Sequence, residues 1–239
     1  MDKEQIISYF NTKYQLNEEQ TAYLNTHAKR FELVLKHINQ SSHQQVLDIG
    51  PSFLSILLKE KYQNNLTLLG FSDLESTGGH LPDIEILKQN NLIVQDLNFW
   101  KVDKNSHPKY DLIICAEVME HLYSSPVILL QNFYNSLKSN GVLMIQTPNA
   151  VALKNRIKLL FGKNPYDIPR ENVKNPGHFR EYTVKELADI AQKAGFELQE
   201  IITDEYFENP SIKSKIYRSL KTIIPASLKS GITIILKKP

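Results

Sequence analysis

Four side chains that can bind a metal or exchange a proton lie in two short stretches of the sequence. Glu117, Glu120 and His121 lie in "AEVMEHL" at positions i, i+3 and i+4, and His178 lies in "NPGHFREYTVKEL". One helical turn would place the first three side chains on the same face. Two carboxylates and an imidazole suit Mg²⁺, Mn²⁺ or Zn²⁺, with His178 as a fourth ligand.

A pocket without a metal is the alternative interpretation of these residues. In that case "EHL" closes the floor of the pocket. His121 or His178 then accepts a proton from a substrate hydroxyl, because imidazole titrates near neutral pH. The sequence leaves both chemistries open.

Acidic residues also stand at the ends of the short apolar runs that predict strands. Asp48 and Gly50 end the first run, Asp73 follows the second, Asp96 ends the third and Glu117 follows the fourth. Ligands of an open parallel sheet bind beyond the carboxyl ends of its strands. Carboxylates at these ends suit a ligand with an amine, a ribose diol and an adenine amino group, and suit a pyrophosphate poorly.

The elements that must position these residues form an alternating pattern. Five apolar runs alternate with helical stretches: "QVLDIG", "LTLLGF", "NLIVQDL", "YDLIICAEV" and "GVLMIQTP". A helix with Thr183 and Glu186 at capping-box spacing and Gly195 as its stop then precedes a sixth strand. The last run, "GITIIL", predicts a seventh, antiparallel strand. The fold class is therefore α/β, a Rossmann-like, seven-stranded, mostly parallel sheet with helices on both faces.

The domain organisation follows from the same pattern. Residues 1–40 are expected to form an N-terminal helical cap, because apolar side chains recur there at three- and four-residue intervals. Residues 41–239 then form one domain with two insertions, a lid at about 148–180 and a basic helical insertion at about 204–230. The chain has 239 residues, of which 41% are apolar, so one substantial core is expected.

Several classes of protein are excluded or disfavoured by composition. No apolar run approaches the roughly 18 residues that cross a bilayer, and "MDKEQIISYF" lacks the pattern of a signal peptide, so we expect a cytoplasmic protein. The single cysteine, Cys115, lies in an apolar run and excludes an internal disulfide. Net charge is +2, but residues 211–239 hold seven basic residues and no acidic one.

Both insertions are basic and amphipathic, which bears on partners. This combination suits an acceptor that carries phosphate or lipid, such as a glycan on a polyprenyl diphosphate or a quinone precursor. The helices would then lie peripherally on the inner face of a membrane. The alternative is that the apolar stripes pack on the core or form a dimer, and the oligomeric state stays open. Nucleic acid is disfavoured, because the chain offers no aromatic stacking platform.

Four stretches carry a resemblance to a known family. "VLDIGPS", "VQDLN", "YDLIICAEVMEHL" and "LKSNGVLMIQTPN" resemble motifs of the class I S-adenosylmethionine-dependent methyltransferases, in the branch of the ubiquinone-type and sugar or natural-product O-methyltransferases. The resemblance implies that Asp48 and Gly50 lie against the methionine part of S-adenosylmethionine. It implies that Asp96 accepts from the adenine amino group, with Leu97 beside the ring. Asp73 is the candidate for the ribose hydroxyls.

The first motif departs from the family pattern of three alternating glycines. Gly50, Ser52 and Leu54 stand at those positions. Serine is small enough for a close approach of the cofactor to the backbone, whereas leucine must point away. The pairing of "ExxEH" with a later histidine is similar to small-RNA 2′-O-methyltransferases, and "ExxEH" alone occurs in ubiquinone-type O-methyltransferases. In both, a metal is implied to lower the pKa of the attacked hydroxyl.

The sequence therefore predicts an enzyme that transfers a methyl group from S-adenosylmethionine to an oxygen of a hydroxylated small molecule or glycan. The rival is a non-catalytic methyltransferase-like protein that uses the sheet for binding or as a scaffold, which the missing glycines favour. A nicotinamide-dependent dehydrogenase is the third interpretation, but the later glycines of GxGxxG are missing.

Overall fold

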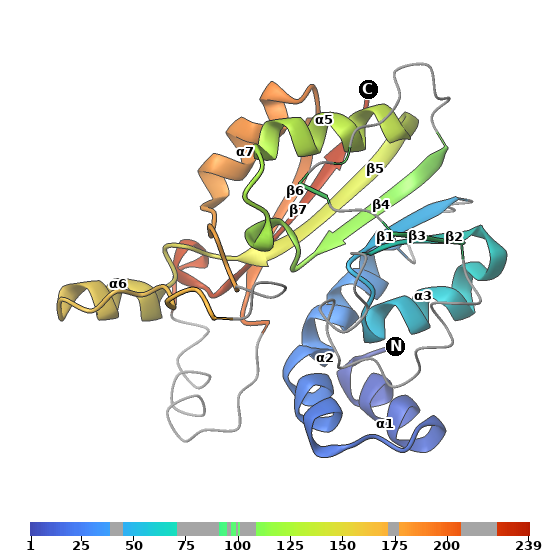
Figure 1. Cartoon of the computed structure of the whole chain (residues 1–239), viewed down its shortest axis with the longest axis horizontal. Helices are drawn as coiled ribbons and strands as arrows, with labels where there is room; N and C mark the ends of the chain where they lie inside the picture. The colour runs from blue at the N-terminus through green and yellow to red at the C-terminus, as the bar shows by residue number, and fades with distance from the viewer. Residues whose placement is uncertain are drawn as a thin grey trace.

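The strands form one sheet in a computed structural model that describes residues 1–38, 45–70, 91–94, 97–98, 100, 109–171, 177–206 and 224–239. The sheet has seven strands in the order β3-β2-β1-β4-β5-β7-β6 (Figure 1). Their bounds are β1 Val46–Ile49, β2 Leu66–Gly70, β3 Asn91–Val94, β4 Tyr110–Ala116, β5 Leu137–Pro148, β6 Glu197–Asp204 and β7 Gly231–Lys237. The predicted Rossmann-like α/β class is confirmed.

The direction of the strands brings the candidate residues to one edge. β1 pairs in parallel with β2 and β4, and β4 pairs in parallel with β5. The last strand, β7, runs antiparallel between β5 and β6, as predicted. Asp48 lies opposite Leu68 and Ile114 in this register, so the carboxyl ends of β1, β2 and β4 meet at the same edge of the sheet.

Helices cover both faces of the sheet. α1 (Lys3–Lys13), α2 (Glu18–Ile38) and α3 (Phe53–Tyr62) lie on one face. α5 (Pro126–Ser136) and α7 (Val184–Lys193) lie on the other (Figure 1). Alternate side chains of β1 point toward opposite faces of the sheet, as successive side chains of a strand do.

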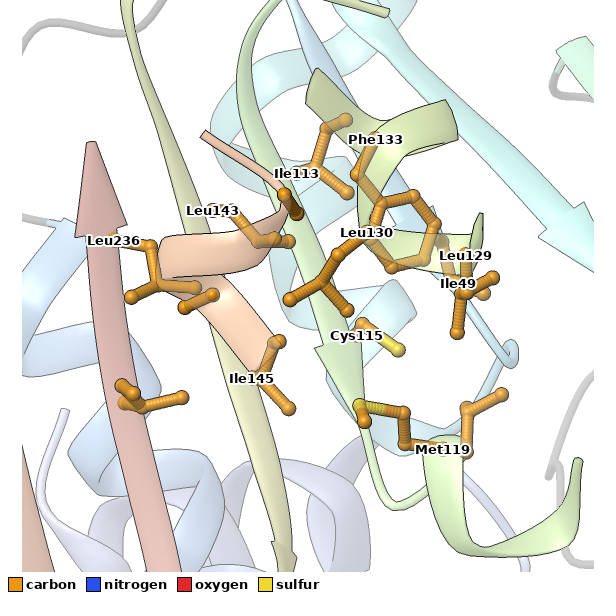
Figure 2. Close-up of a cluster of buried hydrophobic side chains, with 14 of the residues drawn as sticks. Ile49, Ile113, Cys115, Met119, Leu129, Leu130, Phe133, Leu143, Ile145 and Leu236 are labelled. Carbon is orange, nitrogen blue, oxygen red and sulfur yellow. The ribbon is translucent and has the colours of Figure 1, made fainter. Parts of the chain in front are cut away.

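Two apolar cores result, one on each face. On the first face, Val46 belongs to a buried cluster that includes Phe10 and Phe31 of the N-terminal helices. On the second, Leu47 and Ile49 belong to a cluster that includes Leu130 and Phe133 of α5 and the buried Cys115 (Figure 2). The N-terminal helices therefore share a core with the sheet, which brings side chains of α2 close to the end of β1.

The helix ends follow the sequence signals in α7 but not in α5. Thr183 caps α7, its hydroxyl accepting from the Glu186 N–H while the Glu186 carboxylate accepts from the Thr183 N–H, as the capping box predicts. The stretch "SNG" at residues 139–141 is typical of a helix end, but α5 already ends at Ser136 and β5 begins at Leu137. Asn140 instead adopts a left-handed conformation inside β5, with φ of 61°, where the pairing with β4 is irregular.

The two predicted insertions are described in part. The first contains α6 (Leu153–Leu160), and its residues 172–176 lie outside the described residues. The second has residues 207–223 outside the description, followed by a 3₁₀ turn at Ala226–Leu228. Among the described residues, no helix is both long and apolar enough to cross a bilayer.

Candidate functional site

The turn after β1 has room for glycine alone at position 50. Gly50 adopts a φ of 77°, a conformation that side-chain-bearing residues rarely take. Its N–H donates to the Leu69 carbonyl of β2 at 3.0 Å. A Cβ at Gly50 would lie 2.5 Å from Cγ2 of Val118, which follows β4. This turn therefore holds the ends of three strands close together.

Ser52 begins α3. Its hydroxyl accepts from the Leu54 N–H at 3.2 Å, and the Ser55 hydroxyl accepts from the Ser52 N–H at 2.8 Å. Leu54 is buried, so its side chain points into the core, as the sequence predicts. Ser52 is thus a helix cap within the turn where a close approach of the cofactor is expected.

Replacing Ser52 separates these two roles. We expect Ser52→Ala to lower the free energy of unfolding by about 1 kcal/mol and Ser52→Gly by only a few tenths, because glycine is tolerated at helix N-caps. Both variants keep cofactor affinity, since neither adds bulk. Thr183→Ala on α7 is the matched control for loss of a cap alone. Urea denaturation measures stability, and normal cofactor binding by a Ser52→Phe variant would show that this turn is not the site.

Asp48 is buried at the end of β1 and accepts from the Ser55 hydroxyl at 2.6 Å. Burial raises the pKa of Asp48 to about 7, although the Ser55 hydrogen bond and the charge of Arg30 oppose this shift. The carboxylate form therefore gains from any cation that approaches the end of β1. Sequence reasoning missed Ser55, although the i, i+3 spacing from Ser52 was the available signal.

Arg30 of α2 is a site residue that sequence reasoning missed. Its guanidinium is 2% exposed; Nε donates to His27 Nδ1 at 2.9 Å and Nη2 donates to the Tyr23 hydroxyl at 3.2 Å. Nη1 is buried and has no partner among the described residues. A buried guanidinium with an unused donor is costly unless a ligand completes it. The sequence signal that could have identified Arg30 is a single arginine between the apolar positions of this helix.

Glu117 adopts a left-handed conformation directly after β4, with φ of 59°. Its N–H donates to the Gln146 carbonyl at 2.8 Å, which fixes this backbone against β5. Its Oε1 is buried without a partner in the described part of the chain, and burial raises the pKa of the carboxyl group. A non-glycine residue with positive φ costs of order 1–3 kcal/mol and is enriched at functional sites.

A 3₁₀ turn, Met119–His121, follows Glu117 and carries only part of the predicted cluster. Ligand atoms of Glu120, His121 and His178 all lie within 4.8 Å of one another. Glu117 is not part of this group, although its carboxyl group interacts electrostatically with Glu120 and His178. The Phe179 N–H donates to the Glu120 carbonyl at 2.7 Å, which holds the segment around His178 against the turn.

Hydrogen bonds orient the three side chains. His121 donates from Nδ1 to the Gly177 carbonyl at 3.0 Å, and His178 donates from Nδ1 to Glu181 Oε1 at 3.1 Å. Each Nε2 then keeps a lone pair, the arrangement typical of metal-binding histidines. Glu120 Oε2 accepts from Thr147 at 3.0 Å, whereas Oε1 is buried without a partner in the described residues.

The electrostatics of this group favour a bound cation. Burial and the neighbouring Glu117 carboxylate raise the pKa of Glu120 well above its usual value. Burial and the nearby His178 lower the pKa of His121 to about 4, so this imidazole is neutral at pH 7. A cation between these groups would lower the pKa of Glu120 and be coordinated by the lone pair of His121. The donor set therefore fits a divalent metal.

Glu181 connects His178 to the first insertion. Glu181 Oε2 lies 3.5 Å from Nδ2 of Asn155, a buried residue of α6. The same Asn155 amide also donates to the Ala150 carbonyl at 3.1 Å. The position of α6 is thereby linked to the orientation of the His178 ring. Sequence reasoning missed Glu181 and Asn155, because neither forms a local pattern with His178.

A groove of about 680 Å³ lies beside the cluster. Tyr123 and Phe179 line it, with ring centroids 5.6 Å apart at 72°, and both rings are largely exposed. Arg180 and Lys193 line it together with Glu186 and Asp189, and Arg180 is paired with Glu186. The groove therefore offers aromatic faces and charged groups of both signs to a substrate next to the histidines.

The remaining predicted cofactor residues are placed only in part. Leu97 is 2% exposed and belongs to the core on the α5 face. Asp73 and Asp96 lie outside the described residues. Asp48 lies in β1, Gly50 forms the turn after it and Ser52 begins α3, so these three residues lie near one another.

Comparisons with known proteins agree with this geometry. The profile of a family described as "Methyltransferase domain" matches residues 22–201. The chain is 23% identical over 193 residues to a ubiquinone biosynthesis O-methyltransferase of Rickettsia canadensis, covering 80% of this chain and 73% of that protein. It is 26% identical over 92 residues to a probable S-adenosylmethionine-dependent methyltransferase of Mycolicibacterium smegmatis, covering 38% of this chain and 30% of that protein.

Solved structures share the fold at low identity. The N-methyltransferase NodS of Bradyrhizobium japonicum, in complex with S-adenosyl-L-homocysteine, is 13% identical with a TM-score of 0.51, covering 88% of this chain and 86% of that chain. The likeness at this identity concerns the fold. The match to the Mycolicibacterium protein spans less than a third of that protein's length.

Proposed function

Because the chain belongs to the class I S-adenosylmethionine-dependent methyltransferases, we propose that it methylates a hydroxyl group of a small molecule or glycan. The observation that carries this proposal is the convergence of Glu120, His121 and His178 within 4.8 Å, beside the cofactor-binding edge of the sheet. An oxygen acceptor must lose a proton during transfer, and this group offers imidazole lone pairs for it.

The turn and α2 provide the contacts for the cofactor. S-adenosylmethionine supplies a methyl group already activated on a sulfonium, so the protein mainly has to bind and align. Gly50 forms the left-handed turn at the end of β1, and the buried Nη1 of Arg30 is available to a carboxylate. Asp48 lies at the end of the same strand, where its carboxylate would be stabilised by an ammonium group. These groups match the amino-acid end of the cofactor.

Proton removal rests on the histidines. Glu181 holds Nδ1–H of His178, so Nε2 is free to accept the hydroxyl proton. The carbonyl of Gly177 holds His121 in the same tautomer. Both rings are thus oriented before the acceptor binds, and they meet edge to face with centroids 4.7 Å apart.

A divalent metal is the alternative chemistry for the same group, because it would bind the Nε2 lone pairs that otherwise accept the proton. Glu120, His121 and His178 would hold it, and Oε1 of Glu120, buried without a partner among the described residues, is the observation that supports it. Such a metal would lower the pKa of a bound hydroxyl and so make it a better nucleophile. The ligand types suit Mn²⁺ or Zn²⁺, with Mg²⁺ less suited because it prefers oxygen.

The acceptor is proposed to lie in the groove beside the histidines. The exposed rings of Tyr123 and Phe179 suit an aromatic or sugar ring, and Lys193 suits an attached anionic group, whereas Arg180 is paired with Glu186. A phosphate- or lipid-linked glycan and a quinone precursor both fit this description. The name of the Rickettsia relative favours the second, at 23% identity.

Calorimetric titration with S-adenosylmethionine tests the cofactor site. We expect binding by the native protein and a loss of affinity of about ten- to a hundredfold in Arg30→Met, because a charge-assisted hydrogen bond is removed while the volume is kept. The neighbouring Lys29→Met, which loses only a surface ion pair with Glu32, is the matched control. Absence of binding by the native protein at millimolar cofactor would favour the non-catalytic rival.

A further inference from the structure

The segment from α6 to residue 171 exposes more large apolar side chains than any other part of the described chain. We call residues 153–171 the α6 arm. Of the twelve large apolar side chains that are exposed in the described residues, six belong to the arm: Ile157, Leu159, Leu160, Phe161, Tyr166 and Ile168. Leu160 is 81% exposed, Phe161 72% and Ile168 89%. The arm extends sideways from the rest of the described chain (Figure 1).

The arm is not an ordinary amphipathic helix packed on its own core. Within it only Asn155 and Pro165 are buried, and residues 156–164 are exposed on every side of the helix and its following turn. The arm is held by its own contacts, such as Lys158 Nζ donating to the Pro165 carbonyl at 3.0 Å. Its apolar side chains therefore need a partner outside the described residues.

The charge of the arm selects among partners. It holds five basic residues, Lys154, Arg156, Lys158, Lys163 and Arg170, and two acidic ones. A symmetric dimer would place this positive surface against itself, which like charges oppose. A nucleic acid would contact the cations, but four of the six exposed apolar side chains are aliphatic and offer no stacking surface to a base. A bilayer with anionic lipids can contact both the basic and the apolar side chains of the arm. The basic side chains contact its headgroups, and the apolar side chains enter the acyl boundary.

We propose that the α6 arm binds the surface of an anionic membrane, with Leu160, Phe161 and Ile168 entering the bilayer and the arm's lysines and arginines contacting its headgroups. Binding of this kind is peripheral. It can be measured apart from methyl transfer, since none of the exposed residues of the arm belongs to the cofactor turn or the histidine cluster.

Cosedimentation of the full chain with vesicles tests the proposal. Vesicles of equal parts phosphatidylglycerol and phosphatidylcholine are compared with pure phosphatidylcholine. We expect binding to the anionic vesicles only, weakened by salt, and at least about tenfold weaker in Leu160→Ser/Phe161→Ser, because two large apolar side chains no longer enter the bilayer. Lys158→Gln/Lys163→Gln should weaken it by about fivefold per charge removed.

Matched controls separate the alternatives. Ile128→Ser/Leu198→Ser removes two apolar side chains that are exposed elsewhere and should leave vesicle binding unchanged. The proposal is overturned if the native chain ignores anionic vesicles, or if the Leu160/Phe161 variant binds them as tightly as the native chain. It is also overturned if the native chain is a dimer in sedimentation velocity that the same variant dissociates, without vesicle binding. Cofactor titration of the same samples reports separately on the proposed function.

Discussion

Glu120→Gln is expected to lower the rate of methyl transfer at least about a hundredfold while leaving affinity for S-adenosylmethionine nearly unchanged. Glutamine has the shape of a protonated glutamate, and burial favours that neutral form of Glu120. The fold should therefore tolerate the change, with the free energy of unfolding altered by less than about 1 kcal/mol. What is lost is a carboxylate that can hold a metal next to His121 and His178.

The measurement is single-turnover transfer from labelled cofactor, with and without a chelator. We expect the native enzyme to lose activity in chelator and to regain it with added Mn²⁺ or Zn²⁺, and His178→Ala to behave like Glu120→Gln. Glu200→Gln, an exposed glutamate on β6, is the control for a glutamate-to-glutamine change. Full native activity in chelator, together with an active Glu120→Gln, would leave proton transfer to the histidines as the chemistry of this group.

Gly50→Ala is expected to lower the free energy of unfolding by about 2–4 kcal/mol and to weaken cofactor binding. Two costs add at this position. The backbone is left-handed, and the new Cβ would lie 2.5 Å from Cγ2 of the buried Val118. Relief of that contact must move either the turn or the segment after β4, and both belong to the proposed cofactor site.

Two variants separate these costs. Gly162 is also left-handed, with φ of 68°, but a Cβ there meets nothing within 4 Å. Gly162→Ala should therefore cost only the backbone strain of about 1 kcal/mol. Gly50→Ala combined with Val118→Ala should lose less than the sum of the two single changes. If urea denaturation finds Gly50→Ala as stable as Gly162→Ala, the steric argument for this glycine is wrong.

The sequence predicted features that depend on local pattern. Runs such as "YDLIICAEV" identify β4 because a strand buried on both faces needs continuous apolar residues. Thr183 and Glu186 identify the start of α7 because both partners of the capping box are three residues apart. The parallel order of strands then placed Asp48 and the residues after β4 at one edge without further information.

Features that depend on distant neighbours were missed or misplaced. The functional interest of Arg30 arises from burial against the carboxylates at the end of the sheet, and the sequence of α2 gives only a weak signal of it, a single arginine between apolar positions. Glu117 was expected on the helical turn, but its positive φ follows from a hydrogen bond to β5. The structure brings His178 close to Glu120 and His121. The role of Glu181 can be seen only from the hydrogen bond that orients the His178 ring.

The contact that Asn155 makes has a consequence for the kinetics of the enzyme. The Asn155 amide is the buried contact between the arm and Glu181, and Glu181 sets the ring of His178. An enzyme whose membrane-binding arm also supports its proton acceptor would show interfacial activation. Its turnover would then follow the mole fraction of acceptor in the lipid surface and the area of that surface, instead of the bulk concentration of acceptor.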